Sequence, residues 1–115
     1  MNMILYMWGK PQKFKVVFDL FPQEPAANEQ TRAFNLFLGE KKIIIPEIEK
    51  AVQEDLGVED ALSIITPKSF YVKKTGCEDR VIGIFFENKN DPENDYVVII
   101  KNEKLLKIGN QDDIL

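Results

Sequence analysis

The spacing of apolar residues changes twice along this chain, and that change limits the folds it can adopt. Near the start, the segment KFKVVFDLF alternates apolar and polar residues, which is typical of a strand with one buried face. Between residues 28 and 56, apolar residues recur every three or four positions, as on one face of a helix. Runs of β-branched and aromatic residues return from residue 62 onward. This order predicts an α+β fold in which helices pack on one face of an antiparallel sheet.

An N-terminal strand pair is predicted first. It comprises Met3–Trp8 and the KFKVVFDLF segment, with a turn at Gly9–Gln12 and an end at Pro22–Pro25. In the second strand Phe14 and Val16 share one face, while Lys13 lies on the other. The strand pair is therefore expected to have one buried face and one solvent-exposed face.

Two central helices are predicted next. The first begins at Asn28, a suitable N-cap, and ends at Gly39, which can adopt the left-handed conformation of a helix end. The second has Pro46 in its first turn, where the missing N–H costs nothing, and ends at Gly57. Residues 32–38 keep a second interpretation, because their aromatic side chains also suit a strand.

A C-terminal meander is predicted last. Leu62–Ile65 runs into Pro67, and a short strand follows at Ser69–Lys73. A tight two-residue turn at Asn102–Glu103 joins the last two strands. The three strands of the meander are Arg80–Phe86, Tyr96–Lys101 and Lys104–Ile108.

The chain is predicted to be a single domain over residues 1–115, because it has no internal repeat and no linker-like stretch. Its one cysteine, Cys77, allows no internal disulfide, which favours a cytoplasmic setting. The opening MNMILYMW lacks the basic start and the apolar length of a signal peptide. No stretch has the roughly 20 apolar residues of a membrane helix.

The residue inventory argues against most enzyme chemistry. There is no histidine, which removes the commonest general base and the usual zinc ligand. The six glycines are scattered and form no phosphate-binding loop. We therefore predict no catalytic residues, no cofactor-binding residues, no metal ligands and no cofactor. The residue types present still allow one alternative, an enzyme in which two Asp or Glu side chains act as acid and base.

The most polar stretch, ENKNDPEND, separates the apolar runs VIGIFF and YVVII. With Asp91 as the first ligand of a calcium loop, Glu93 and Asp95 fall at positions three and five. Tyr96 then takes the place that requires glycine, and Asn102 replaces the final glutamate, so an EF-hand is excluded. The stretch is interpreted as the connection of a hairpin, with weak cation binding as the alternative.

A set of aromatic, glycine and acidic positions from Glu29 onward matches a known sequence pattern: Gln30, Ala33, Phe34, Phe37, Leu38, Gly83, Phe85, Phe86, Asp91, Glu93, Gly109 and Asp112. In this pattern the chain resembles a group of small bacterial α+β domains of unknown function, some of which look like immunity proteins encoded beside polymorphic toxins. The resemblance spans about three quarters of the chain. The chain departs from the group at Glu93–Asp95, where a Glu-His-Gly sequence is usual.

The charge balance points to a protein partner. The net charge is −4 and Lys and Arg form no cluster, so a nucleic-acid partner is not expected. We predict a non-catalytic protein that binds another protein through acidic side chains, with the resemblance implying a basic toxin domain. The alternative function is a module that binds a small molecule or a cation. A homodimer formed by edge-strand pairing is also open, because nothing in Met3–Trp8 protects an edge. The predicted partner-binding residues are Asp91, Glu93, Asp95, Glu54, Asp55, Glu59 and Asp60.

Overall fold

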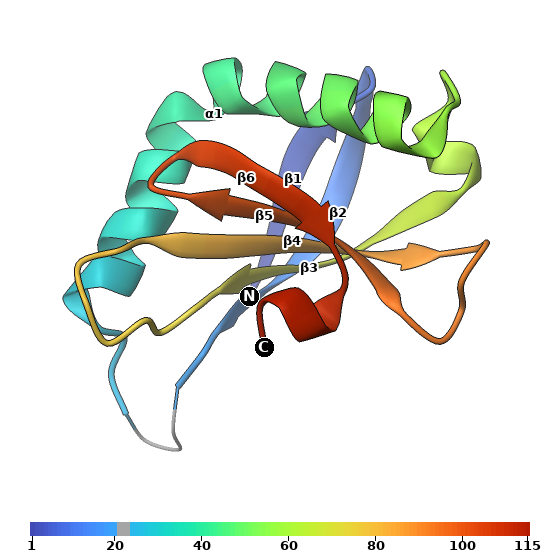
Figure 1. The fold of residues 1–115 in the computed structure, drawn as a ribbon. Helices are drawn as coiled ribbons and strands as arrows, with labels where there is room; N and C mark the ends of the chain where they lie inside the picture. Colours follow the sequence, from blue (N-terminus) through green and yellow to red (C-terminus); the bar gives the residue numbers. More distant parts are fainter. Residues whose placement is uncertain (21–23) are drawn as a thin grey trace.

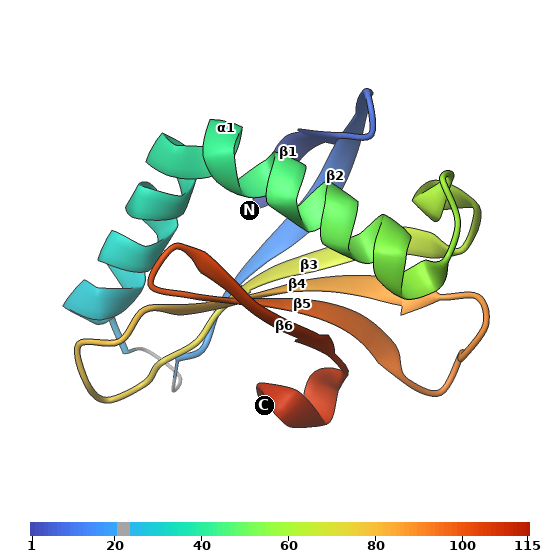
Figure 2. The same cartoon turned by 45° about the horizontal axis from the view of Figure 1, so that its top comes forward.

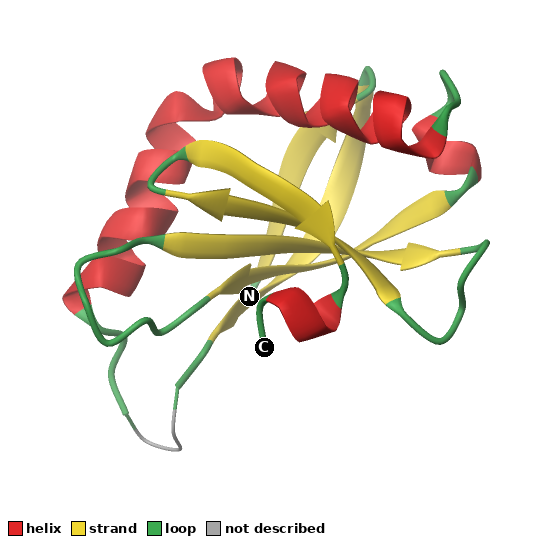
Figure 3. Ribbon diagram, in the orientation of Figure 1, coloured by secondary structure: helices red, strands yellow, loops and turns green. Residues whose placement is uncertain are grey.

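The computed structural model describes residues 1–20 and 24–115. Six strands form one sheet in the order β1-β2-β3-β4-β5-β6, and a long helix, α1, crosses one face of it (Figures 1 and 3). The predicted α+β class is confirmed. The elements are β1 Asn2–Met7, β2 Lys10–Phe18, α1 Asn28–Leu56, β3 Ile65–Val72, β4 Val81–Asn88, β5 Asp95–Lys101 and β6 Lys104–Gly109, with short 3₁₀ turns η1 Ala61–Ser63 and η2 Gln111–Asp113.

The sheet is mixed, so the prediction of a wholly antiparallel sheet is wrong at one position. Strands β2 and β3 run parallel, with Lys15 beside Ser69 and Phe18 beside Val72. The other neighbouring strands are antiparallel, which confirms both the N-terminal pair and the C-terminal meander. A parallel pair needs a long crossover between its strands, and α1 supplies it.

A single continuous helix replaces the two predicted helices. α1 runs through Gly39, which does not adopt the left-handed conformation, and ends at Gly57, which does, with a φ of 68°. The helix is sharply bent, so that its first half runs beside the strands and its second half crosses above them (Figures 1 and 2). Pro46 lies inside the helix, where its ring removes a backbone hydrogen bond and crowds the preceding turn. The predicted break between helices is therefore a bend.

The ends of α1 agree with the sequence in part. Residues 32–38 are helical, so the strand alternative for this segment is wrong. The N-cap is Ala27 rather than Asn28, and the Gln30 side chain accepts a hydrogen bond from its N–H. The described part of the chain holds no helix with an apolar stretch long enough to cross a membrane.

The turn of the N-terminal pair begins one residue earlier than predicted and is shorter, because Lys10, Pro11 and Gln12 of the predicted turn Gly9–Gln12 belong to β2. Trp8 and Gly9 form it with φ values of 51° and 72°, which is the two-residue turn that suits the twist of a hairpin. Pro11 consequently lies inside β2, opposite Tyr6. β2 ends at Phe18, and of the predicted strand end at Pro22–Pro25, residues 22 and 23 lie outside the described residues.

The later turns and boundaries follow the sequence more closely. Asn102 and Glu103 form the predicted two-residue turn, with φ values of 50° and 63°. β3 begins at Ile65 and includes Pro67, where the pairing register with β4 shifts. A register shift is one of the few places where a strand tolerates proline, so the strand is longer than the predicted Ser69–Lys73.

The main hydrophobic core lies between α1 and the sheet. Phe37 of α1 contacts Phe70 of β3 edge-on, with ring centroids 4.9 Å apart. Both limbs of the bent helix contribute to this core, because the first buries Ala33 and Phe37 and the second buries Ile48 and Val52. Packing of the helix on one face of the sheet is thus confirmed.

A smaller core lies on the opposite face of the sheet. Ile114, directly after η2, packs with Phe85 and Val97 and is 3% exposed. Gly83 makes room for it, because a Cβ on Gly83 would lie 2.6 Å from Ile114 Cδ1 and 2.9 Å from Phe85 Cε1. The chain after β6 therefore covers part of the face that α1 leaves open.

Substituting Gly83→Val should lower the free energy of unfolding by about 1–3 kcal/mol, because the new side chain overlaps Ile114 and Phe85. The control is Gly39→Ala, where a Cβ meets nothing within 4 Å and α1 gains a better helix former. That change should raise stability, by up to about 1 kcal/mol. Chemical denaturation of both variants measures this, and a neutral Gly83→Val would contradict the packing described.

Candidate functional site

The seven carboxylates predicted to bind a partner lie at one end of the molecule. Three segments meet there: the C-terminal turn of α1, the approach to η1, and the turn between β4 and β5 (Figures 1 and 2). We call this region the acidic end. Its predicted members are Glu54, Asp55, Glu59, Asp60, Asp91, Glu93 and Asp95.

A hydrogen bond between α1 and β5 fixes one side of the acidic end. The Tyr96 hydroxyl donates to Asp55 Oδ2 at 2.8 Å. The Tyr96 side chain is part of the core and only 6% exposed, while Asp55 is exposed. Burial, with the hydrogen bond to Asp55 and its charge, raises the pKa of Tyr96 well above its usual value. Asp55 is thereby held in place at the surface.

The β4–β5 turn is held by side chains from other elements. Asp95 forms an ion pair with Lys68 of β3 at 2.9 Å. The Asp95 N–H donates to Gln111 Oε1 at 2.8 Å, and the Gln111 amide donates to Asn94 Oδ1 at 2.9 Å. Asn94 in turn donates to Asp91 Oδ2 at 3.1 Å. These bonds give the turn a defined shape.

Two open depressions lie on either side of this turn. One, of about 330 Å³, is lined by Asp55, Asp91, Asp95 and Tyr96 together with the end of β6 and residues that follow it. The other, of about 490 Å³, is lined more evenly by acidic and basic groups, including Lys68 and Lys89. The structure therefore brings three of the predicted residues, Asp55, Asp91 and Asp95, to one depression.

The remaining predicted residues lie beside these depressions. Glu54 and Glu59 border a shallow depression at the end of α1, where the Gln53 amide donates to the Glu59 carbonyl at 2.7 Å. Asp60 is the N-cap of η1, and its carbonyl accepts from the Ser63 hydroxyl at 2.6 Å. Glu93 is exposed on the β4–β5 turn. Among the described residues, no group of three or more Cys, Asp or Glu side chains is arranged to hold a metal ion.

The sequence did not indicate the side chains that organise this end. Lys68 is 27 positions from its partner Asp95, and Tyr96 is 41 positions from Asp55. The only local signal was Tyr96 at the start of an apolar strand, because a buried tyrosine hydroxyl usually finds a hydrogen-bond partner. Its partner follows from the tertiary fold alone.

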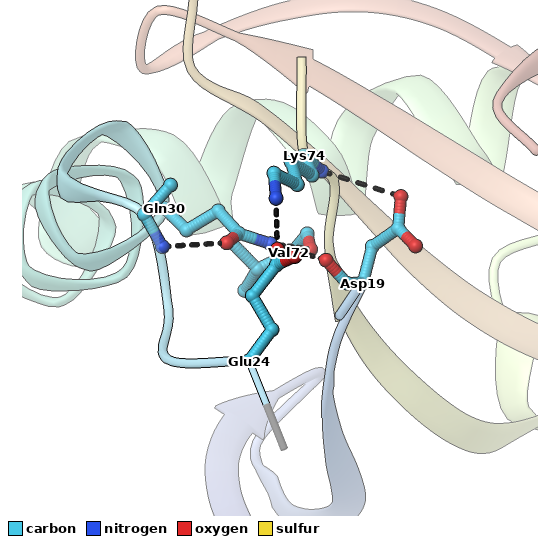
Figure 4. Close-up of polar contacts among 6 residues, drawn as sticks. Asp19, Glu24, Gln30, Val72 and Lys74 are labelled. Atoms are coloured by element: carbon cyan, nitrogen blue, oxygen red, sulfur yellow. Dashed lines mark hydrogen bonds and ion pairs between the residues drawn. The ribbon is translucent and has the colours of Figure 1, made fainter. Parts of the chain in front are cut away.

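A second polar cluster lies where α1 begins, away from the acidic end. Gln30 is fully buried, and its amide nitrogen donates to the carbonyls of Asp19 at 3.0 Å and Val72 at 3.2 Å (Figure 4). Its amide oxygen accepts from the Ala27 N–H at 2.9 Å. Lys74 contacts the Glu24 carboxylate beside it. Gln30 thus joins the start of α1 to the ends of β2 and β3.

Comparisons with protein-family models, with curated protein sequences and with solved structures gave no match.

Gln30→Leu should lower the free energy of unfolding by about 2–3 kcal/mol, because it leaves buried backbone groups without their hydrogen bonds. Gln53→Leu is the matched control, since the Gln53 amide bonds to a carbonyl in an exposed setting. The control should cost less than about 0.5 kcal/mol. Urea denaturation of the two variants measures the difference, and equal losses would contradict the role of Gln30.

Stability at alkaline pH should depend on Tyr96. In the unfolded chain a tyrosine ionises near pH 10, whereas Tyr96 in the folded protein keeps its proton because its pKa is raised. The unfolded state then binds fewer protons, so the free energy of unfolding falls as the pH rises above about 10. Tyr71, whose pKa burial and Asp19 raise to about 12, adds to this fall.

Tyr96→Phe should make that fall shallower between about pH 10 and 12. Urea denaturation of the wild type and the variant, at a series of pH values from 8 to about 12, measures the slope. Identical slopes would show that the Tyr96 hydroxyl is not protected in the folded state.

Proposed function

We propose that the protein is a non-catalytic binding protein that docks its acidic end onto a basic surface of another protein and blocks that surface. The observation that carries the proposal is the convergence of carboxylates from three separate segments at one end of the fold. Such a concentration of one charge sign attracts a partner of the opposite sign and orients it on approach.

The contacts inside the acidic end divide its carboxylates by role. Asp95 is neutralised by Lys68 and Asp55 accepts from Tyr96, so both serve first to fix the shape of the surface. Glu54, Glu93 and Asp91 are exposed, and the carboxylate of Asp91 also accepts a hydrogen bond from Asn94. We assign the main electrostatic contacts with the partner to these three.

Support also comes from how firmly the surface is held. The β4–β5 turn is bonded to β3 and to η2, so little conformational freedom remains to be lost on binding. A rigid acidic surface suits occlusion of a basic site. The narrower role of an immunity protein for a co-encoded toxin rests on the resemblance of the sequence.

The test is co-expression with the product of the adjacent gene, followed by purification of the complex and kinetic binding measurements. We expect this chain to relieve the toxicity of that product and to form a complex with it. The association rate should fall as salt rises, because exposed charges are screened. If the co-expressed chain gave no protection and formed no complex, the proposal would be contradicted.

Charge-removing variants locate the surface. The triple variant Glu54→Gln, Asp91→Asn and Glu93→Gln should slow association by about tenfold at low salt, and the difference should shrink at high salt. The control is Glu40→Gln, Glu47→Gln and Glu78→Gln, which removes the same charge from exposed positions away from the acidic end. All six positions are exposed, so stability should change by less than about 0.5 kcal/mol per substitution. Equal slowing by both triple variants would assign the effect to net charge instead.

A further inference from the structure

The two edge strands of the sheet differ in how they are protected. β6 carries Lys104 and Lys107 and has a register shift against β5, two devices that discourage a further strand from pairing. β1 has the sequence NMILYM, without charge or proline, and pairs with β2 in an unbroken register. An unprotected edge of this kind is a template for strand addition.

The outward backbone groups of β1 follow from its pairing with β2. The Val16 N–H donates to the Met1 carbonyl at 2.8 Å, so Met1 faces β2. Directions alternate along an antiparallel strand, and Asn2, Ile4 and Tyr6 therefore turn their N–H and C=O groups away from β2. The next residue in this series, Trp8, donates its N–H to the Glu49 carboxylate of α1. The open edge thus has three residues and ends at Tyr6.

We propose that β1 pairs in antiparallel orientation with β1 of a second copy of this chain, about a twofold axis at Ile4. The three outward residues are evenly spaced around Ile4, so the edge is complementary to itself. Ile4 then faces Ile4 of the second copy, and Asn2 faces Tyr6. Each such pair exchanges two hydrogen bonds, giving about six across the seam.

The exposed side chains of β1 fit this arrangement. Ile4 is 56% exposed and Tyr6 is 71% exposed, and both alternate with Leu5, which is buried under α1. At the seam, Ile4 of each copy covers that of the other. Large apolar side chains on the unprotected edge are thereby removed from water.

The lysines of α1 that lie nearest Tyr6 are compatible with the twofold axis. Lys41 and Lys42 of α1 border the same depression as Tyr6. In the paired arrangement the two Tyr6 residues are offset by four residues, which is about 14 Å along the strands. Because each lysine pair borders the Tyr6 of its own copy, we expect the two pairs to lie farther apart than the screening length of about 8 Å at physiological salt.

The acidic end remains free in such a dimer. Strands β2 and β3 separate β1 from the β4–β5 turn in the sheet. This inference does not depend on the proposed function, and either can fail without the other.

The experiment is sedimentation velocity over a dilution series, with Ile4→Lys and Leu106→Lys as matched variants. The wild type should approach twice the chain mass of 13.3 kDa at high concentration. Ile4→Lys should stay monomeric, because it places two ammonium groups opposite each other at the axis. Leu106, which is 58% exposed on β6, provides the control, and Leu106→Lys should dimerise as the wild type does.

Amide hydrogen exchange on the wild-type protein tests the register without any variant. The N–H groups of Ile4 and Tyr6 should exchange at least tenfold more slowly at high concentration than after dilution, while Trp8 should not change. A monomer at every concentration would overturn the proposal, as would a dimer in which the Ile4 amide still exchanges rapidly. If Leu106→Lys lost the dimer and Ile4→Lys kept it, the contact would lie on β6, and this result would also overturn the proposal.

Discussion

A single helix must cover the apolar face of a six-stranded sheet, and this requirement bends it. A straight helix of 29 residues would be about 44 Å long, whereas the longest dimension of the molecule is 39 Å. Each limb of α1 buries apolar side chains, Phe37 in the first and Ile48 in the second. Straightening the helix would expose one of these groups to water. Pro46 favours the bend, because its ring removes a hydrogen bond that a straight helix would have.

The crossover between parallel strands β2 and β3 depends on the same helix. Gln30 bonds to the carbonyls that end both strands, so the start of α1 is tied to the point where the crossover leaves the sheet. At the opposite end of α1, Asp55 accepts a hydrogen bond from Tyr96 of β5. The helix is therefore held at both ends. The hydrogen bond between Tyr96 and Asp55 also fixes the position of α1 at the acidic end.

Much of the fold could be predicted because period-two alternation and turn residues are local signals. The Asn102–Glu103 turn and the strands around it follow from them directly. Gly39 was misleading, since its conformation depends on whether the chain beyond it can remain helical against the sheet. The parallel pairing of β2 with β3 was missed because alternation reveals which face of a strand is buried and not which strand lies beside it.

The acidic candidates could also be identified from local sequence. The role of each carboxylate could not be predicted. Whether a carboxylate faces solvent or is neutralised depends on partners far along the chain, such as Lys68 for Asp95. The structural role of Gln30 could not be predicted from the sequence either. Nothing in the sequence around Gln30 indicates that its side-chain amide bonds to three backbone groups.

The protection of β6 has a consequence for assembly. A sheet with two open edges can add molecules at both, and such head-to-tail contacts grow into filaments unless they close. Here the lysines and the register shift of β6 discourage strand addition at one edge, which leaves β1 as the edge open to a neighbouring strand. Growth through strands must then stop after one addition, so the chain can expose an apolar edge without becoming a seed for fibres.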